Sequence, residues 1–241
     1  MHSKPSEIPQ FAQRHREAEK LSPMLIDLSH LITEGMATYP GIPGPELSDF
    51  LSRDTSAERF GDIRMHIGKV CMITNTGTYV DVPFHFFEDG QHLGEVEVKH
   101  LADLPAILVD ARQRAGREVT PDFFSSLDVA EKAVLVMTGW DQFFGTEQYA
   151  VNAPFLPKES VELLIEANAA MVGIDSVNID SIDDLTRPAH CGLLRSGIPI
   201  VEHLTGLAQL EGVGAFTFTA APPKFNALGT FPVRAFARTL S

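Results

Sequence analysis

The sequence predicts a single α/β domain built around a mixed β-sheet, and three observations lead to this fold class. Short runs rich in β-branched and aromatic residues recur along the chain. Fewer helical patterns lie between these runs. No linker rich in Gly, Ser or Pro and no fixed-period repeat divides the 241 residues. A chain of this length can form one large domain.

The polar and charged residues 1–23 are expected to form an N-terminal extension, with a short helix around 11–20. They contain no apolar segment typical of a signal peptide. The domain itself is expected to span 24–241. Its predicted strands are the apolar runs at 24–30, 66–74, 106–111, 133–139, 170–175, 214–220 and 232–238.

Three helices are predicted between the strands. The clearest covers 157–169, where Pro157 suits the first turn. One face of that helix carries Val161, Leu164, Ile165 and Asn168. A second, short helix begins at 120–121. A third is predicted over 187–196, and Gly197 is placed to end it.

The composition excludes several classes of protein. The net charge is -13 and no cluster of Lys and Arg is present, which argues against a nucleic-acid partner. The two cysteines, Cys71 and Cys191, are far apart, which excludes a disulfide-dense scaffold and a zinc ribbon. No apolar run approaches the roughly 20 residues that cross a bilayer. We therefore expect a cytoplasmic protein without a membrane partner.

The residues with the clearest chemical potential lie in the stretch NTGTYVDVPFHFFEDG, at 75–90. Tyr79 and Asp81 stand two apart in an extended segment, so their side chains share a face. Pro83 introduces a bend, after which His85 can turn back toward Asp81. A converging carboxylate and imidazole suit a metal centre or a proton-transfer site. The alternative is that Asp81 caps a turn and His85 donates to a backbone carbonyl, and spacing alone does not decide between them.

Residues 75–85 read NTGTYVDVPFH and resemble HxGTHxDxPxH, the signature of the metal-dependent cyclase family, which includes bacterial kynurenine formamidase and isatin hydrolase. The Gly-Thr pair, the Asp, the Pro and the last His match. Asn75 and Tyr79 replace the two earlier histidines. The resemblance extends over the chain from about Met24 and includes blocks at 26–41, 134–145, 172–180 and 232–238.

The resemblance implies a swivelling β/β/α fold, a homo-oligomer (dimer or tetramer) and a metal site. In the family, the two motif histidines and the aspartate hold one divalent ion. The aspartate, with a later His and Glu, holds a second ion, and the last motif histidine transfers protons. In this chain the second set is Asp81, His190 and Glu202, and the proton-transfer residue is His85. The first set has lost both imidazoles.

Three outcomes follow from the substitutions at Asn75 and Tyr79. An amide oxygen is a weak ligand for zinc or manganese, and a phenol must lose a proton before it binds well. In the first, one ion, zinc or manganese, remains at the second set. In the second, an ion occupies a mixed site that uses Asn75 or Tyr79. In the third, no ion is bound, and both residues form hydrogen bonds to a ligand. We favour one ion per chain, because all three ligands of the second set are retained and both replacements are polar.

Other residues near the motif have simpler interpretations. Thr78 is expected to help shape the substrate pocket. His66 is a candidate replacement ligand, although a hydrogen-bonded histidine at a strand start explains it as well. Cys191 points away from its helical neighbour His190 and is expected to be a buried, inert thiol. His92 and His203 are expected to be solvated.

We therefore expect a metal-dependent hydrolase of a small amide, cyclic amide or lactone. Its chemistry would be arylformamidase-like, acting on C–N bonds other than peptide bonds, with a small-molecule substrate. Two alternatives stay open. One is a non-catalytic protein that binds a small molecule in a modified site. The other is a metal-free cyclase or lyase that uses His85 and Tyr79 as acid and base.

Overall fold

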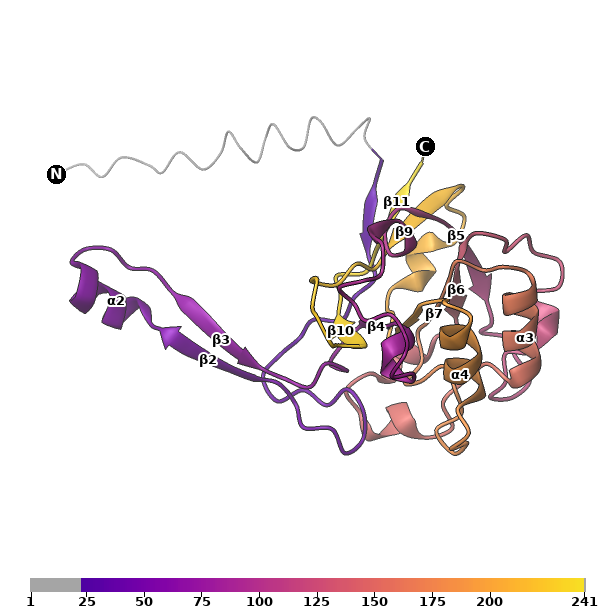
Figure 1. The fold of residues 1–241 in the computed structure, drawn as a ribbon, viewed down its shortest axis with the longest axis horizontal. Helices are drawn as coiled ribbons and strands as arrows, with labels where there is room; N and C mark the ends of the chain where they lie inside the picture. Colours follow the sequence, from indigo (N-terminus) through magenta and orange to yellow (C-terminus); the bar gives the residue numbers. More distant parts are fainter. Residues whose placement is uncertain (1–22, 241) are drawn as a thin grey trace.

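The computed structural model describes residues 23–240, in which nine strands form one curled, mixed sheet (Figure 1). The predicted extension at 1–23, apart from Pro23, and its helix at 11–20 lie outside the described residues. In their order across the sheet the strands are β1 (Leu25–Asp27), β11 (Phe236–Thr239), β9 (Phe216–Thr219), β5 (Leu104–Asp110), β6 (Ala133–Met137), β7 (Met171–Ile174), β8 (Ile200–Glu202), β4 (Tyr79–Asp81) and β10 (Thr230–Pro232).

The centre of the sheet is parallel and its two sides are antiparallel. β5, β6, β7 and β8 pair in parallel, whereas the remaining pairings are antiparallel. The predicted single α/β domain with a mixed sheet is confirmed. Six of the seven predicted runs contribute to this sheet, while β4, β8 and β10, at three residues each, were not predicted as separate strands.

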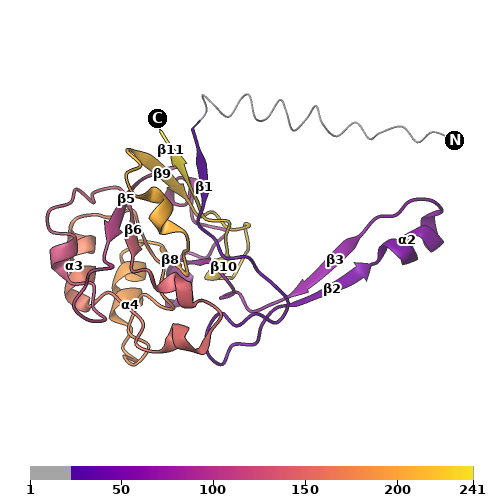
Figure 2. The ribbon, with the colours of Figure 1, turned by 180° about the vertical axis from the view of Figure 1, so that it is seen from behind.

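Two α-helices cover one face of the sheet, α3 (Lys158–Glu166) and α4 (Pro188–Arg195), and they lie side by side (Figures 1 and 2). Both were predicted, and Gly197 adopts the expected left-handed conformation at φ 74° just beyond α4. The predicted helix at 120–121 is a single 3₁₀ turn. The 3₁₀ turns are Pro83–His85, Val98–His100, Pro121–Phe123, Trp140–Phe143, Glu147–Ala150 and Leu207–Leu210.

The core lies on both faces of the central strands. In β6, Val134 and Val136 pack with the residues of α3 and α4, whereas Leu135 and Met137 belong to the cluster on the opposite face. Successive side chains of a strand point to opposite faces, so a strand buried on both sides is apolar throughout. This explains why the run at 133–139 is continuously apolar and easy to recognise in the sequence.

A long arm projects from this body (Figures 1 and 2). It consists of β2 (Glu46–Leu51), β3 (Ile67–Cys71) and, at its tip, α2 (Arg53–Phe60). The predicted strand at 66–74 is therefore a strand of the arm and does not belong to the central sheet. Exposed apolar side chains on or beside the arm are Leu47, Phe50, Phe60, Ile63, Met65, Ile67 and Val70. No helix among the described residues is long and apolar enough to cross a membrane.

The turn that follows β4 is held in place by Gly229. The carbonyl of Gly229 accepts a hydrogen bond from the amide of Val82 at 2.9 Å. A Cβ at position 229 would overlap the backbone N and Cα of His85. Backbone atoms cannot give way as the end of a flexible side chain can, so this position requires glycine because the two chain segments approach closely.

We therefore expect Gly229→Ala to lower the free energy of unfolding by about 1–3 kcal/mol, as overpacking does in a close-packed interior. Gly214→Ala is the matched control, because a Cβ there meets no atom within 4 Å and the φ of Gly214 is not positive. Urea unfolding of the two variants measures the difference. Equal midpoints would contradict the close approach at Gly229.

Candidate functional site

The pairing of β4 with β8 brings two acidic side chains into the interior. The antiparallel register sets Tyr79 opposite Glu202 and Asp81 opposite Ile200. All the residues of both strands are buried, and the side chains of Asp81 and Glu202 have no exposed surface. Two carboxylates are therefore removed from water within the same pair of strands, which is costly unless a cation or several donors compensate for it.

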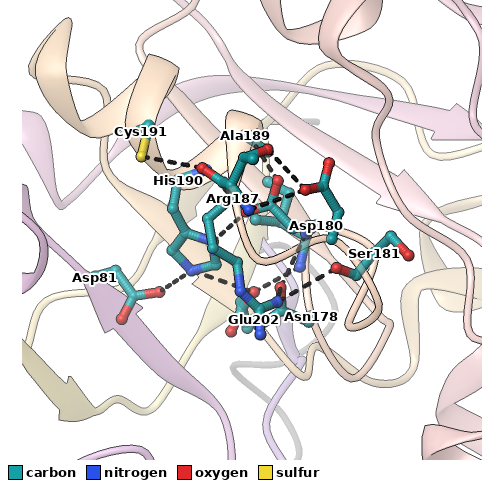
Figure 3. Close-up of polar contacts among 12 residues, drawn as sticks. Asp81, Asn178, Asp180, Ser181, Arg187, Ala189, His190, Cys191 and Glu202 are labelled. Carbon is teal, nitrogen blue, oxygen red and sulfur yellow. Dashed lines mark hydrogen bonds and ion pairs between the residues drawn. The ribbon is translucent and has the colours of Figure 1, made fainter.

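Helix α4 adds an imidazole to these carboxylates. Asp180 accepts hydrogen bonds from the backbone N–H groups of Ala189 at 2.6 Å and His190 at 3.0 Å, and so caps the helix (Figure 3). Asp180 also accepts a hydrogen bond from Nδ1 of His190 at 2.6 Å. The Nε2 atom of His190 then lies 3.6 Å from Asp81 Oδ2 and 3.7 Å from Glu202 Oε1. Because Nδ1 carries the proton in the neutral ring, the lone pair of Nε2 is directed at the two carboxylates.

The carboxylate of Asp81 has no hydrogen-bond partner at either oxygen, although both oxygens are buried. Buried polar atoms in folded proteins nearly always have a partner, so each exception needs an explanation. A divalent cation would satisfy both oxygens. One imidazole nitrogen with carboxylate oxygens is a ligand set that suits zinc or manganese. The residues therefore fit a metal ion.

His85 also approaches this group. Its Nε2 lies 4.0 Å from Asp81 Oδ1, and about 30% of its side chain is exposed. Asp81, His85 and His190 each offer one ligand atom, and these three atoms lie within 4.8 Å of one another. The group shares Asp81 and His190 with the predicted ligand set, but it contains His85 where the prediction has Glu202. Glu202 still faces His190, so the structure brings all four residues together.

The pKa shifts reflect an excess of buried negative charge. Burial alone would lower the pKa of His190, but its hydrogen bond to Asp180 and the nearby carboxylates of Asp81 and Glu202 raise the pKa to about 10. Burial, with the charge of Asp81, raises the pKa of Glu202 to about 7. Burial lowers the pKa of His85 below its usual value.

The two motif substitutions are both engaged in hydrogen bonds. The hydroxyl of Tyr79 donates to Glu202 Oε2 at 2.5 Å, and burial followed by the charges of Glu202 and Asp81 raises the pKa of this phenol well above its usual value. Asn75 Oδ1 accepts a hydrogen bond from the hydroxyl of Thr230 at 3.1 Å. A neutral phenol donates a hydrogen bond more readily than it binds a metal. Tyr79 therefore holds Glu202 in place where the motif has an imidazole.

A cavity of about 290 Å³ opens onto this group. Its lining residues are Tyr39, Ile42, Asn75, Tyr79, His85, Phe86, Asn178, Arg187 and His190. The ring of Phe86 stacks on the ring of His190, with centroids 4.8 Å apart and an interplanar angle of 18°. A small, flat molecule can lie in this cavity beside His85 and His190.

Of the four residues predicted to bind the substrate or to form an altered first metal site, Asn75 and Tyr79 line the cavity, whereas Thr78 and His66 do not. The hydroxyl of Thr78 accepts a hydrogen bond from the amide of His30 at 3.0 Å and donates to the carbonyl of His203 at 2.5 Å, so it joins buried backbone segments. His66 lies at the start of β3 on the arm, where its Nε2 is 2.8 Å from Asp49 Oδ1.

The predicted exposure of His203 is wrong. Its side chain is fully buried, its Nδ1 lies 2.9 Å from the hydroxyl of Tyr149, and burial lowers its pKa to about 3. It directly follows β8, all of whose residues are buried. His92 is also only 20% exposed, beside Glu95, and Cys191 is half-buried and not enclosed as predicted.

Three polar residues of the site were missed by the sequence analysis: Asn178, Asp180 and Arg187. Asp180 and Asn178 lie in the segment 172–180, which does resemble a family block. The available signal was an Asp shortly before a predicted helix, which is typical of a helix cap. Nothing in the local pattern indicates that Asp180 also bonds the side chain of His190, because that contact depends on how the loop folds back.

The fold and this buried group of acidic and histidine residues define a protein of the metal-dependent cyclase class. The family model described as "Putative cyclase" matches residues 26–181, and the chain belongs to that family. The predicted family membership is confirmed.

Curated relatives match nearly the whole chain. Kynurenine formamidase from Bacillus cytotoxicus is 27% identical over 215 residues, covering 89% of this chain and 97% of the relative. Kynurenine formamidase from Salinibacter ruber is 30% identical over 217 residues, with the same coverage of 89% and 97%. Both relatives hydrolyse an amide, as their name states.

Solved structures share the fold. Isatin hydrolase A from Ralstonia solanacearum has a TM-score of 0.78 at 20% identity and covers 99% of both chains. Isatin hydrolase A from Labrenzia aggregata, bound to benzyl benzoate, has a TM-score of 0.80 at 20% identity, covering 96% of this chain and 99% of its own. At these identities the likeness concerns the fold, and the predicted cyclase-like fold is confirmed.

Asp180 provides a test of the metal centre that leaves the four candidate ligands unchanged. We expect Asp180→Asn to weaken zinc or manganese binding by about 10- to 100-fold, because residues that orient a histidine ligand have effects of this size. The amide keeps an acceptor for the backbone of α4. Competition with a chelator measures the affinity. Asp183→Asn, which changes a largely exposed carboxylate paired with Arg117, is the control. Unchanged affinity in Asp180→Asn would contradict the role of Asp180.

Proposed function

We propose that the protein is a metal-dependent hydrolase of a small amide, cyclic amide or lactone, with arylformamidase-like chemistry on C–N bonds other than peptide bonds. The observation that carries the proposal is the buried carboxylate of Asp81, which lacks any hydrogen-bond partner and lies beside His190 and His85 at the cavity. The amide hydrolases among its relatives support the reaction type.

One divalent ion, zinc or manganese, would be held by Asp81, His190 and Glu202. Such an ion polarises a substrate carbonyl and lowers the pKa of a bound water from about 16 to about 7. Through its bond to Nδ1, Asp180 orients the ring of His190 so that Nε2 faces Asp81 and Glu202, and it makes that nitrogen a stronger ligand. Tyr79 and the amide of Ile179 fix the two oxygens of Glu202, at 2.5 and 2.6 Å. The ligands are therefore preorganised before the ion binds.

His85 is the residue that moves protons. It is the most accessible of the four ligand-type side chains, and it lines the cavity. Its imidazole can take a proton from the attacking water and deliver it to the leaving nitrogen or oxygen. Asp81 lies 4.0 Å from Nε2 of His85, close enough to favour the protonated imidazole during this transfer.

We expect His85→Ala to lower turnover by about 10²- to 10⁴-fold, which is the contribution of a general acid–base residue. The metal content should remain near that of the wild type. The assay is a panel of formamides, cyclic amides and lactones, N-formylkynurenine included, with zinc or manganese supplied. His92→Ala, at a half-buried histidine outside the cavity, is the control and should keep full turnover.

The outcomes of this assay distinguish the possible roles of His85 and the alternative functions of the protein. Unchanged turnover in His85→Ala would remove His85 from the mechanism, and loss of metal together with activity would make it a ligand. A wild-type protein that binds these compounds and turns none of them over would favour a non-catalytic binding protein. Turnover that survives removal of all metal would favour a metal-free cyclase or lyase.

A further inference from the structure

Arg187 is the only arginine or lysine among the residues that line the cavity. It stands immediately before α4, three residues ahead of His190, and both residues, which are labelled in Figure 3, line the cavity. Its backbone is left-handed, with φ 49° and ψ 55°, which is unusual for a residue with a side chain. Such conformations gather at functional sites, where the surrounding structure maintains them.

The guanidinium of Arg187 retains most of its hydrogen-bonding capacity. Only Nη1 is used, and it donates to Asn178 Oδ1 at 3.2 Å and to the carbonyl of Ser181 at 3.4 Å. Both acceptors are neutral. A guanidinium offers five N–H donors, so Nε and Nη2 are left for another group. The two contacts hold the side chain in position without neutralising its charge.

Two other arginines of this region do pair with a carboxylate. Arg117 pairs with Asp183 at 2.9 Å, and Arg195 lies 3.4 Å from Asp89. In the part of the chain that the structure describes, residues 23–240, no carboxylate forms an ion pair with Arg187. The charge of Arg187 does reach Asp184, whose pKa it helps to lower, but no carboxylate of the described residues touches the guanidinium. A half-buried cation of this kind, at the wall of a cavity, is suited to an anionic ligand.

The rest of the wall indicates the form of that ligand. Tyr39, Ile42 and Phe86 offer flat or apolar surface, and Asn75 and Asn178 offer amides. His85 and His190 mark the end where bond cleavage would occur. A volume of about 290 Å³ is at the small end of ligand sites and suits a molecule built on a single ring. The planar fork of a guanidinium matches the two oxygens of a carboxylate.

We propose that Arg187 binds a carboxylate of the substrate, and that the natural substrate is a small, ring-bearing amide or lactone that carries this negative charge. The inference rests on the proposed hydrolase function and adds the substrate class. Arg187 acts as a specificity-determining residue: it positions the anion at one end of the cavity while the scissile carbonyl lies toward His85 and the ligands of the metal.

The test compares two formamides that differ only in a carboxylate, formanilide and 2-formamidobenzoate. The wild type should prefer 2-formamidobenzoate by about 10- to 100-fold in kcat/KM, as expected for a site built to bond a polar group. Arg187→Met, which keeps an unbranched apolar stem and removes the guanidinium, should abolish this preference chiefly by raising KM. The loss of kcat/KM should be larger for 2-formamidobenzoate than for formanilide. Arg187→Lys should restore part of the preference, because it keeps the charge and loses the fork.

Arg195→Met is the matched control, because Arg195 lies at the other end of α4, stacks on Phe87 and does not line the cavity. Arg195→Met should keep the preference of the wild type for 2-formamidobenzoate. Equal kcat/KM of the wild type for the two formamides, or an unchanged preference in Arg187→Met, would overturn the proposal.

A binding measurement separates this proposal from the proposed function. Calorimetry with 2-aminobenzoate and with aniline, the two product amines, requires no turnover. The wild type should bind 2-aminobenzoate more tightly, and Arg187→Met should lose that difference. If neither formamide is hydrolysed but this binding pattern holds, the hydrolase function fails and the carboxylate site stands. Equal binding of 2-aminobenzoate by the wild type and Arg187→Met would overturn the site itself.

Discussion

The carboxylate of Asp81 is fully buried and neither of its oxygens accepts a hydrogen bond. A buried carboxylate that accepts no hydrogen bond costs several kcal/mol unless a cation or a protonated imidazole compensates for it. The neighbouring strand and helix supply groups that can hold a compensating cation. β8 adds Glu202, α4 adds His190, and Asp180 fixes the imidazole so that its free nitrogen faces both carboxylates. A metal ion is the group that these contacts suit, and the proposed chemistry depends on it.

The hydrogen bond from Tyr79 to Glu202 explains how the motif can change without emptying the site. Tyr79 stands where the family signature has a histidine, and its phenol bonds Glu202, a member of the predicted ligand set. Asn75 bonds to Thr230 on the adjoining strand β10. Both substitutions thus form polar contacts that hold the site rigid. The structure is that of a reorganised centre, and this supports one ion per chain.

The parts of the fold that the sequence could predict are those whose burial leaves a pattern. β6 is apolar along its whole length because both faces are covered, and α3 and α4 show a helical period. β4, β8 and β10 have three residues each, too few for a period to appear. Asp81, His85, His190 and Glu202 were found because they match a family signature. Asp180 and Arg187 were not, since their roles arise from a loop that folds back onto the site, and no spacing encodes that contact. His203 was misjudged because its burial is set by Tyr149 and other residues distant in the sequence.

The number of metal ions bound per chain tests this account most directly. After dialysis against a buffer of fixed free zinc or manganese, elemental analysis of the wild type should give about one ion per chain, held by a three-ligand set. In the double variant Asn75→His with Tyr79→His, the value should rise toward about two, because imidazoles bind these metals better than an amide or a phenol does. A wild-type protein that holds two ions, or none with either metal supplied, would contradict the account.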